Sequence, residues 1–168
     1  MQLRQSQLKE GRPICPSDSN HRVHAHGRYE RNKTPDDVET FEVPRFICTQ
    51  CGLTFSVLPD DVVPYRPIST QLLESGLDCA FLDKDPPPLT ENEKGCLKRA
   101  CQSFIQNIPF LTDTLGQIIK TTHPSAAQLW QELRELSGTM SEILLYLAAL
   151  FKVSLLGMYR CLTFRCAN

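Results

Sequence analysis

The sequence lacks the short motifs that mark common catalytic and nucleotide-binding sites. It contains no phosphate-binding glycine loop, no Gly-x-Ser-x-Gly turn and no dinucleotide-binding fingerprint. Of its four histidines, only His123 lies beyond residue 26. Nothing in the sequence places this histidine beside a cysteine, which a nucleophilic thiol requires. These absences predict a protein that is not an enzyme.

The sequence also lacks an apolar leader and a clear membrane span. Residues 1–12 are polar, which predicts no signal peptide and a cytoplasmic protein. The eight cysteines are therefore interpreted as metal ligands and free thiols, not as a secreted disulfide framework. Residues 143–159 are strongly apolar but slightly too short for a membrane, and Lys152 lies at their midpoint. We expect this helix to be buried in protein or to form one face of a homodimer.

The net charge of −1 conceals an uneven distribution along the chain. Residues 1–35 have seven Lys and Arg against three acids, whereas residues 59–93 have two against eight. Residues 94–168 have eight against four. A flexible basic arm over residues 1–12 is therefore followed by an acidic connector further along the chain.

Three cysteines and one histidine have the spacing of a metal site made from two halves. Cys48 and Cys51 stand three positions apart and Gly52 follows them, which is typical of a thiolate knuckle that chelates one ion. The other half begins upstream at Cys15, with His21 six positions further on. The predicted ligands of one structural Zn²⁺ are Cys15, His21, Cys48 and Cys51.

The fourth ligand has alternatives. A standard ribbon has a second cysteine where this chain has Asp18, and a carboxylate is also a zinc ligand. Asp18 is therefore the alternative to His21, and His24 and His26 come after it. A further alternative is a metal-free sheet in which the cysteines are merely small buried residues.

The pattern around these residues predicts three antiparallel strands. Apolar and polar residues alternate over residues 21–31, and a turn-rich segment follows. The return strand is expected over residues 41–47, with Pro44 tolerable only at an edge or bulge, and a third strand over residues 53–58. Such a sheet buries little apolar surface, whereas structural zinc contributes about 10–16 kcal/mol in small peptides. The predicted domain is a zinc ribbon over residues 13–67.

Several motifs in this domain resemble the zinc-ribbon module of insertion-sequence transposases and of their small stand-alone relatives. The motifs are Cys15-Pro16, His26-Gly27-Arg28-Tyr29-x-Arg31, Val43-Pro44-Arg45-Phe46-x-Cys48-x-x-Cys51, Thr54-Phe55-Ser56-x-Leu58-Pro59 and Pro64-Tyr65. The resemblance implies metal positions at Cys15, in the region of Asp18 and His21, and at Cys48 and Cys51. Residues 68–168 are too few for the catalytic domain of such an enzyme. The resemblance therefore implies a transposase accessory protein or a shortened relative.

Residues 68–168 have a helical pattern and predict a bundle of four or five helices, so the fold class is α+β. Helices are expected over residues 68–82, from Thr90 to about Ile108, from Pro109 to Ile119, over residues 126–136, and from Met140 to about Leu162. Thr90-x-x-Glu93 and Thr139-x-x-Glu142 are capping boxes that open the second and the last of these. Trp130 is expected in the core, with an interface anchor as the alternative.

Basic side chains on the arm and hairpin predict weak, phosphate-dominated DNA binding. The alternation places Arg22, His24, His26 and Arg28 on one strand face, with a solvated face as the alternative. The candidate contacts are Arg12, Arg22, Arg28, Arg31 and Lys33. The predicted function is a non-enzymatic, transposon-associated zinc-ribbon protein. The alternative is a protein–protein adaptor whose zinc site is purely structural.

Overall fold

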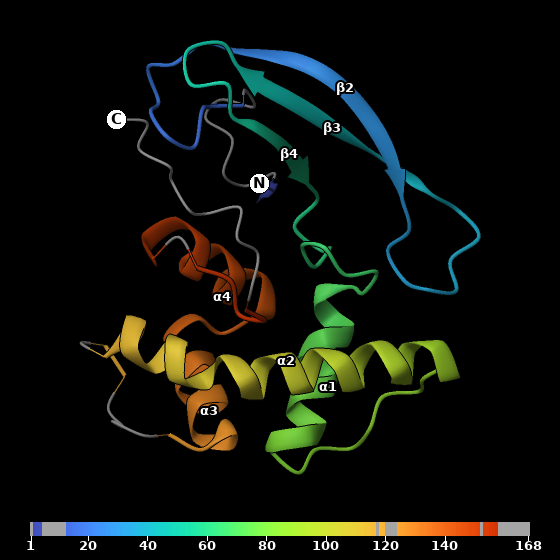
Figure 1. Cartoon of the computed structure of the whole chain (residues 1–168). Helices are drawn as coiled ribbons and strands as arrows, with labels where there is room; N and C mark the ends of the chain where they lie inside the picture. Colours follow the sequence, from blue (N-terminus) through green and yellow to red (C-terminus); the bar gives the residue numbers. More distant parts are fainter. Residues whose placement is uncertain (1, 5–12, 117, 120–123, 152, 158–168) are drawn as a thin grey trace. The chain divides into compact units, whose positions relative to one another are not determined.

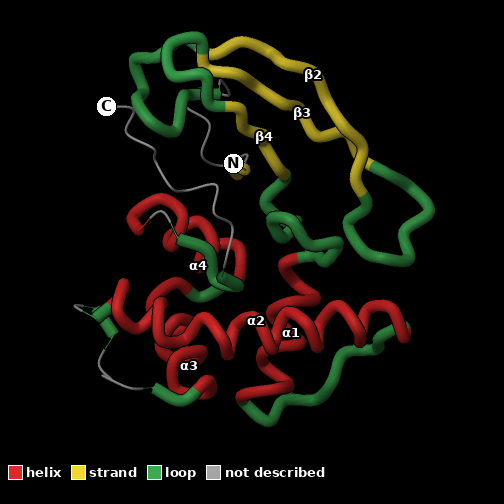
Figure 2. The backbone as a smooth tube through the Cα atoms, in the orientation of Figure 1, coloured by secondary structure: helices red, strands yellow, loops and turns green. Residues whose placement is uncertain are grey.

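The computed structural model consists of two compact units, Met1–Ser69 and Thr70–Asn168, which we call the sheet unit and the helical unit. Strands occupy the first unit and helices the second, so the predicted α+β class is confirmed (Figures 1 and 2). The structure describes residues 2–4, 13–116, 118–119, 124–151 and 153–157. Arg12, His123 and Lys152 lie outside these residues.

The sheet unit contains the three predicted antiparallel strands and one short addition. Strands β2 (Val23–Arg31) and β3 (Phe41–Cys48) form a hairpin, and β4 (Thr54–Leu58) pairs with β3. Residues Gln2–Arg4 form β1, which pairs in parallel with β4 and was not expected in the basic arm. The strand order is β1-β4-β3-β2, so β2 is an edge of the sheet.

A bulge in β2 corrects the predicted strand faces. Between the pairs Ala25–Phe46 and Arg28–Pro44, β2 has one residue more than β3, and Gly27 there has a φ of 109° that favours glycine. Pro44 thus lies beside a bulge, as predicted. Side chains alternate between the two faces along a strand, so the extra residue moves the side chains after it to the other face. Arg28 therefore lies on the opposite face from His24. The prediction of one shared face is wrong.

One apolar cluster lies on a single face of the sheet. Phe55 and Val57 are buried, and Val23 and Phe46 pack against them. The rings of Phe46 and Phe55 are stacked, with centroids 5.8 Å apart. These four residues lie on one face, since Phe46 pairs with Phe55 and Val23 lies two positions before the Phe46 partner Ala25.

The helical unit contains four α-helices in the described residues. They are α1 (Thr70–Phe81), α2 (Glu91–Leu115), α3 (Ala126–Ser137) and α4 (Met140–Tyr146), and α4 continues as the π-helical turn η2 (Leu147–Phe151). The capping boxes predicted at Thr90 and Thr139 are both present. A third capping box, in which Ser125 pairs with Gln128, opens α3 and was missed.

Pro109 does not break α2, contrary to the prediction of two helices. A proline removes one backbone hydrogen bond inside a helix and costs about 3 kcal/mol. The helix continues because Leu111 and Leu115 extend the buried stripe that begins with Leu97 and Phe104. Burial of each of these leucines contributes about 1.5–3 kcal/mol, which offsets the cost.

The last helix ends much earlier than predicted. After η2, residues 153–157 are not helical, and Gly157 has a φ of 68°. The buried Asn107 of α2 holds this segment, since its Nδ2 donates to the carbonyls of Ser154 at 2.9 Å and Leu155 at 3.2 Å. Residues 158–162 of the predicted helix lie outside the described part of the chain. Within the described residues, no helix has the length and apolar character needed to cross a membrane.

Trp130 lies in the core of the helical unit, as predicted. Its side chain is fully buried, and its ring meets that of Phe104 edge-on at 6.3 Å between centroids. Helix α2 contacts α1 and α3, while α4 contacts α1 and α3 (Figure 1). Trp130 is the only tryptophan in the sequence, so its fluorescence reports on the helical unit alone.

Substitution by alanine at Gly76 and at Gly95 of the helical unit should change the free energy of unfolding in opposite directions. A Cβ at Gly76 of α1 would lie 2.6 Å from Leu97 Cδ2, whereas one at Gly95 of α2 meets only Arg99 Nη1 at 3.5 Å. Alanine raises helix propensity by about 1 kcal/mol at either site, but overpacking costs about 1–3 kcal/mol. In denaturant titrations followed by Trp130 fluorescence, Gly95→Ala should raise the free energy of unfolding and Gly76→Ala should lower it. Equal stabilisation by both would show that α1 and α2 are not tightly packed at Gly76.

Candidate metal centre

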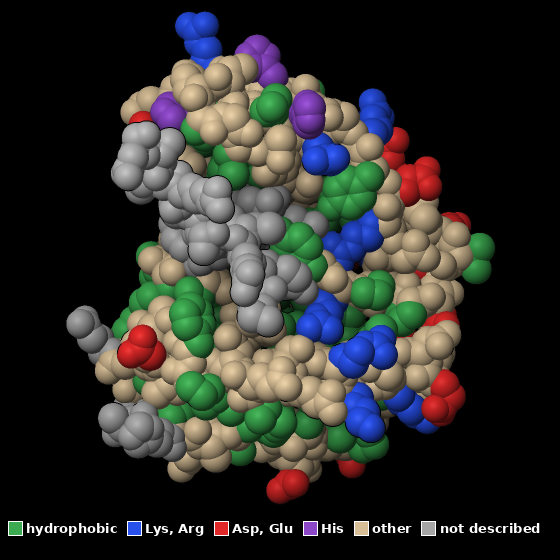
Figure 3. Space-filling model, viewed as in Figure 1, with side chains coloured by type: hydrophobic (Ala, Val, Ile, Leu, Met, Phe, Trp, Pro, Cys, Tyr) green, Lys and Arg blue, Asp and Glu red, His purple; other side chains and the backbone are tan. Residues whose placement is uncertain are grey.

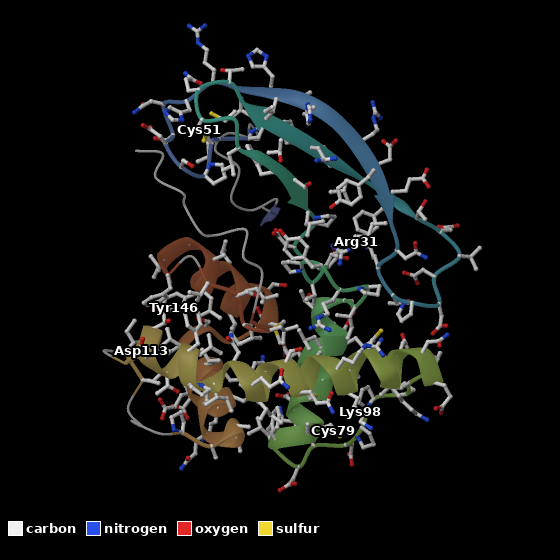
Figure 4. All side chains as sticks on the ribbon, in the orientation of Figure 1. Arg31, Cys51, Cys79, Lys98, Asp113 and Tyr146 are labelled. Atoms are coloured by element: carbon white, nitrogen blue, oxygen red, sulfur yellow. The ribbon has the colours of Figure 1, made fainter. Side chains whose placement is uncertain are left out.

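Four side chains converge at one end of the β2–β3 hairpin. Cys15 lies in the loop before β2, His21 in the following turn, Cys48 at the end of β3 and Cys51 in the turn to β4. Their ligand atoms all lie within 4.8 Å of one another. Cys15 Sγ is 3.6 Å from Cys51 Sγ, and Cys48 Sγ is 3.5 Å from His21 Nδ1. Figure 4 shows Cys51 among neighbouring sulfur atoms. This geometry can hold one metal ion.

The turn between β3 and β4 positions two of the sulfurs. The Cys48 N–H donates to the Leu53 carbonyl at 2.9 Å, and the Gly52 N–H donates to the Cys48 carbonyl at 3.0 Å. Gly52 has a φ of 69°, a conformation that glycine adopts without steric cost. The turn then directs the Cys51 N–H toward Cys48 Sγ at 3.4 Å. This is the knuckle geometry that the Cys48-x-x-Cys51-Gly52 spacing predicts.

The other half of the site is joined to this knuckle through the residues around Arg22. The Arg22 N–H donates to Gln50 Oε1 at 2.7 Å, and the Thr49 N–H donates to the Arg22 carbonyl at 3.1 Å. Gln50 and Thr49 were not among the predicted residues of the site. No local signal marks them, because their partner is 27 or 28 residues away in the chain.

The structure separates the candidates for the fourth ligand. His21 directs Nδ1 into the cluster, while its Nε2 lies 3.7 Å from Asp18 Oδ2. The His21 N–H also donates to the Asp18 carbonyl at 3.1 Å, which fixes the turn between them. Asp18 therefore lies beyond the imidazole, where a carboxylate orients a ligand histidine. His24 and His26 are exposed on β2 and are not part of the cluster.

A comparison with known families matches this part of the chain. The model of a domain of unknown function, DUF6431, matches residues 13–99, which is more than half of the 168 residues. The chain belongs to this family. The matched range includes all four residues of the cluster. The family description carries no link to insertion-sequence transposases, so that resemblance stays a prediction.

The other comparisons add no relatives to the DUF6431 domain. No curated protein matches the chain, and no solved structure matches it. The chemistry of the site must therefore be argued from this chain's own residues.

Two thiols of the DUF6431 domain have shifted pKa values. A hydrogen bond from the backbone of Leu53 is the main cause that lowers the pKa of Cys51 to about 6, with contributions from Cys48, His21 and Cys15. Burial raises the pKa of Cys15. Cys51 is thus a thiolate at neutral pH, and the thiolate is the form that binds metals. Cys15 must lose its proton when a metal binds.

The predicted nucleic-acid contacts of the DUF6431 domain differ in availability. Arg31 Nη2 donates to the carbonyls of Val63, at 2.6 Å, and Arg66. This half-buried guanidinium fixes a loop and is therefore engaged within the protein. Arg28 Nη1 lies 2.8 Å from Glu42 Oε2, and Lys33 Nζ lies 2.7 Å from Asp61 Oδ2.

Arg22 and Arg45 are the exposed arginines with the fewest competing contacts. Among the described residues, neither has a carboxylate within ion-pair distance, and both side chains are exposed. Arg45 was not among the predicted contacts. The register puts Arg45 on the same face as His24, because His24 pairs with Ile47 two positions along β3. In Figure 3, histidine side chains stand at the surface of the sheet unit with Lys and Arg side chains nearby.

Proposed function

We propose that the DUF6431 domain of this chain binds one structural zinc ion through Cys15, His21, Cys48 and Cys51. Three sulfurs and one imidazole nitrogen form a soft, four-donor set that suits tetrahedral Zn²⁺. With all four positions supplied by protein, the ion has no open position for a substrate or a reactive water. The observation that carries this proposal is the convergence of the four ligand atoms within 4.8 Å.

We further propose a non-enzymatic role in which the sheet unit binds nucleic acid weakly through phosphate contacts. The surface consists of Arg22, His24 and Arg45, which are exposed beside the metal centre. Arginines at such a surface neutralise phosphates without reading base edges. The motifs that resemble transposase zinc ribbons support a transposon-associated accessory role.

Two other predicted contacts do not belong to this surface, because Arg28 lies on the opposite face from His24 and Lys33 follows the far end of β2. The ion pairs of Arg28 with Glu42 and of Lys33 with Asp61 are exposed, and pairs of this kind contribute about 0–1 kcal/mol. The phosphate contacts are assigned to Arg22 and Arg45. With about two phosphates neutralised, log K should fall with log salt with a slope of about −2.

The test removes Arg22 and Arg45 together. The double variant Arg22→Ala/Arg45→Ala should weaken binding to all DNA sequences alike and flatten the salt slope by about 2. The measurement is fluorescence anisotropy of a labelled mixed-sequence duplex and of a single strand over a salt series. Zinc content, measured in parallel, establishes that the sheet unit is folded.

A matched control removes the same charge from the helical unit. Lys94→Ala/Lys98→Ala takes two exposed lysines from α2 and should leave the affinity nearly unchanged. Equal losses in both double variants would show that binding follows net charge and not this surface. If the wild type binds neither the duplex nor the single strand at about 50 mM salt, the nucleic-acid proposal is wrong. The adaptor function would then take its place.

A further inference from the structure

A shallow groove lies at the end of β2 opposite the metal centre. It has a volume of about 560 Å³ and is lined mainly by rings: Tyr29, Tyr65, Pro35 and Pro67, with Arg31, Asn32 and Thr34 completing it. Six residues of β2, residues 23–28, lie between the turn of His21 and the first groove residue Tyr29, which at about 3.3 Å per residue is about 20 Å of strand. The groove is therefore a separate site from the metal centre.

Arg31 builds the groove by fixing the loop after β4. Its guanidinium donates to the carbonyls of Val63 and Arg66, on either side of Tyr65 (Figure 4). Hydrogen bonds within the loop add to this, since the Val63 N–H donates to the Ile68 carbonyl at 3.1 Å. Tyr65 is thus held near Tyr29, although the two residues are far apart in the sequence.

Tyr65 is held in an unusual backbone conformation. Its φ is 60°, in the left-handed region that bulky residues rarely adopt. Strained residues of this kind concentrate at binding and catalytic sites, where surrounding contacts maintain them. Tyr65 is also 37% exposed, so its ring is accessible to a partner.

The groove accounts for two motifs that the metal site leaves unused. Tyr29-x-Arg31 and Pro64-Tyr65 were singled out in the sequence, but neither contributes a metal ligand. Both contribute to the groove, either as lining residues or as neighbours of them. A separate binding role for this end of the sheet explains why these residue types occur here.

We propose that this groove binds a proline-rich segment of a partner protein in which Lys or Arg residues flank the prolines. Flat aromatic and proline rings form the kind of surface on which extended proline-rich segments dock. Such a segment is already ordered as a polyproline helix, so it loses little entropy on binding to a shallow site. The proposal does not depend on nucleic-acid binding by the opposite end of the sheet.

The charge around the groove favours a basic flank. Residues 30–39 and 60–66 together contain six carboxylates and three cationic side chains, a net of −3. Arg31 binds backbone carbonyls, and Lys33 and Asp61 form an ion pair that leaves this net charge unchanged. The acidic surroundings repel phosphates, which disfavours a nucleic-acid strand at this site, and attract Lys and Arg.

The test uses the full chain with zinc bound and a fluorescein-labelled peptide. The peptide repeats Pro-Pro-Leu-Pro and ends in Lys-Lys, and two comparison peptides end in Glu-Glu or have alanine in place of proline. Fluorescence anisotropy should show saturable binding of the first peptide only. Tyr65→Ala should weaken this binding about ten-fold or more, as truncation of an aromatic anchor does. Tyr65→Phe should keep most of it.

Val38→Ala serves as the control variant. Val38 lies in the turn after β2, is 97% exposed and does not line the groove, so its loss should leave the affinity unchanged. Retained zinc shows that each variant is folded. Wild type that binds none of the peptides, or that binds the Glu-Glu peptide equally well, would overturn the proposal. So would Tyr65-dependent binding of oligo(dT) without peptide binding, which would assign the groove to nucleic acid.

Discussion

Cys48→Ser is expected to release the metal and unfold the sheet unit while the helical unit stays folded. Cys48 is fully buried, and its Sγ accepts a hydrogen bond from the Cys51 N–H at 3.4 Å, which helps to hold the turn. Burial of a single apolar side chain contributes about 1.5–3 kcal/mol, and besides its cysteines the described part of the sheet unit buries seven such side chains: Val43, Phe55, Val57, Leu58, Val62, Val63 and Ile68. Structural zinc contributes about 10–16 kcal/mol in small peptides, which is as large as the net stability of about 5–15 kcal/mol of an ordinary domain, so its loss is expected to unfold the unit.

Elemental analysis and hydrogen exchange measure this result. Wild type purified without added metal should contain one zinc per chain, and Cys48→Ser almost none. Amides of residues 13–67 should lose protection in the variant, whereas Trp130 fluorescence should not change. Cys79→Ser in α1 is the control and should keep its zinc, because Cys79 lies outside the cluster. Wild type without zinc, or Cys48→Ser with a full complement, would refute the zinc assignment.

The roles of His21 and Asp18 can be distinguished by the zinc affinity of two variants. His21→Ala removes a ligand and should abolish tight binding. Asp18→Ala removes only the carboxylate beyond Nε2 and should weaken affinity about 10–100-fold. The measurement is competition with a chelator of known affinity. A larger loss in Asp18→Ala than in His21→Ala would move the fourth ligand to Asp18.

The sequence predicted the metal cluster because its signal is local. Cys48, Cys51 and Gly52 lie in one turn, which aligns two of the three sulfurs. The sequence could not decide between Asp18 and His21, because both residues lie in the same short turn and either could reach the metal. The choice depends on which ring nitrogen faces the knuckle, and the contacts of Arg22 with Thr49 and Gln50 fix that arrangement.

Helix starts were predictable for the same reason, and helix ends were not. Thr90 and Thr139 carry capping boxes that act over three residues. The continuation of α2 through Pro109 depends on burial of Leu111 and Leu115 by other helices. The early end of the last helix depends on Asn107, which is 47 residues away from Ser154. Both the continuation of α2 and the end of the last helix depend on tertiary packing, which a local sequence pattern does not reveal.

The bulge in β2 shows how one residue changes a functional prediction. Strict alternation placed Arg28 with His24, and a single extra residue beside Gly27 moved it to the other face. Gly27 was the available signal, because an isolated glycine in a strand often marks a bulge. Arg45 shares a face with His24 independently of the bulge, because it lies two positions along β3 from Ile47, the partner of His24.

Asp78→Ala is expected to destabilise the helical unit by about 3 kcal/mol, because it leaves a buried donor without an acceptor. Asp78 is 7% exposed on α1, and its Oδ1 accepts a 2.8 Å hydrogen bond from Trp130 Nε1 on α3. Its Oδ2 accepts from Lys84 Nζ at 2.6 Å, and Arg134 Nε lies 4.0 Å from Oδ1. One carboxylate thus connects α1, α3 and the loop after α1.

The contribution of this carboxylate depends on pH. Burial raises the pKa of Asp78, but hydrogen bonds from Lys84 and Trp130 and the charge of Arg134 outweigh it, so the pKa lies below its ordinary value. A carboxyl group with a lowered pKa in the folded state stabilises the protein above its unfolded pKa of about 3.9. This stabilisation is lost as the pH falls through the folded pKa. Asp78→Asn should therefore differ most from wild type above about pH 4, and the difference should shrink below it.

Urea titrations followed by Trp130 fluorescence test both variants against Asp113→Ala. Asp113 is exposed on α2 (Figure 4), and its removal should change the free energy of unfolding by less than about 0.5 kcal/mol. Asp78→Asn should lose less stability than Asp78→Ala, since its amide oxygen still accepts from Trp130. An Asp78→Ala midpoint equal to that of Asp113→Ala would show that the hydrogen bond to Trp130 contributes nothing. A constant difference between Asp78→Asn and wild type from pH 7 to pH values well below about 4 would contradict the lowered pKa.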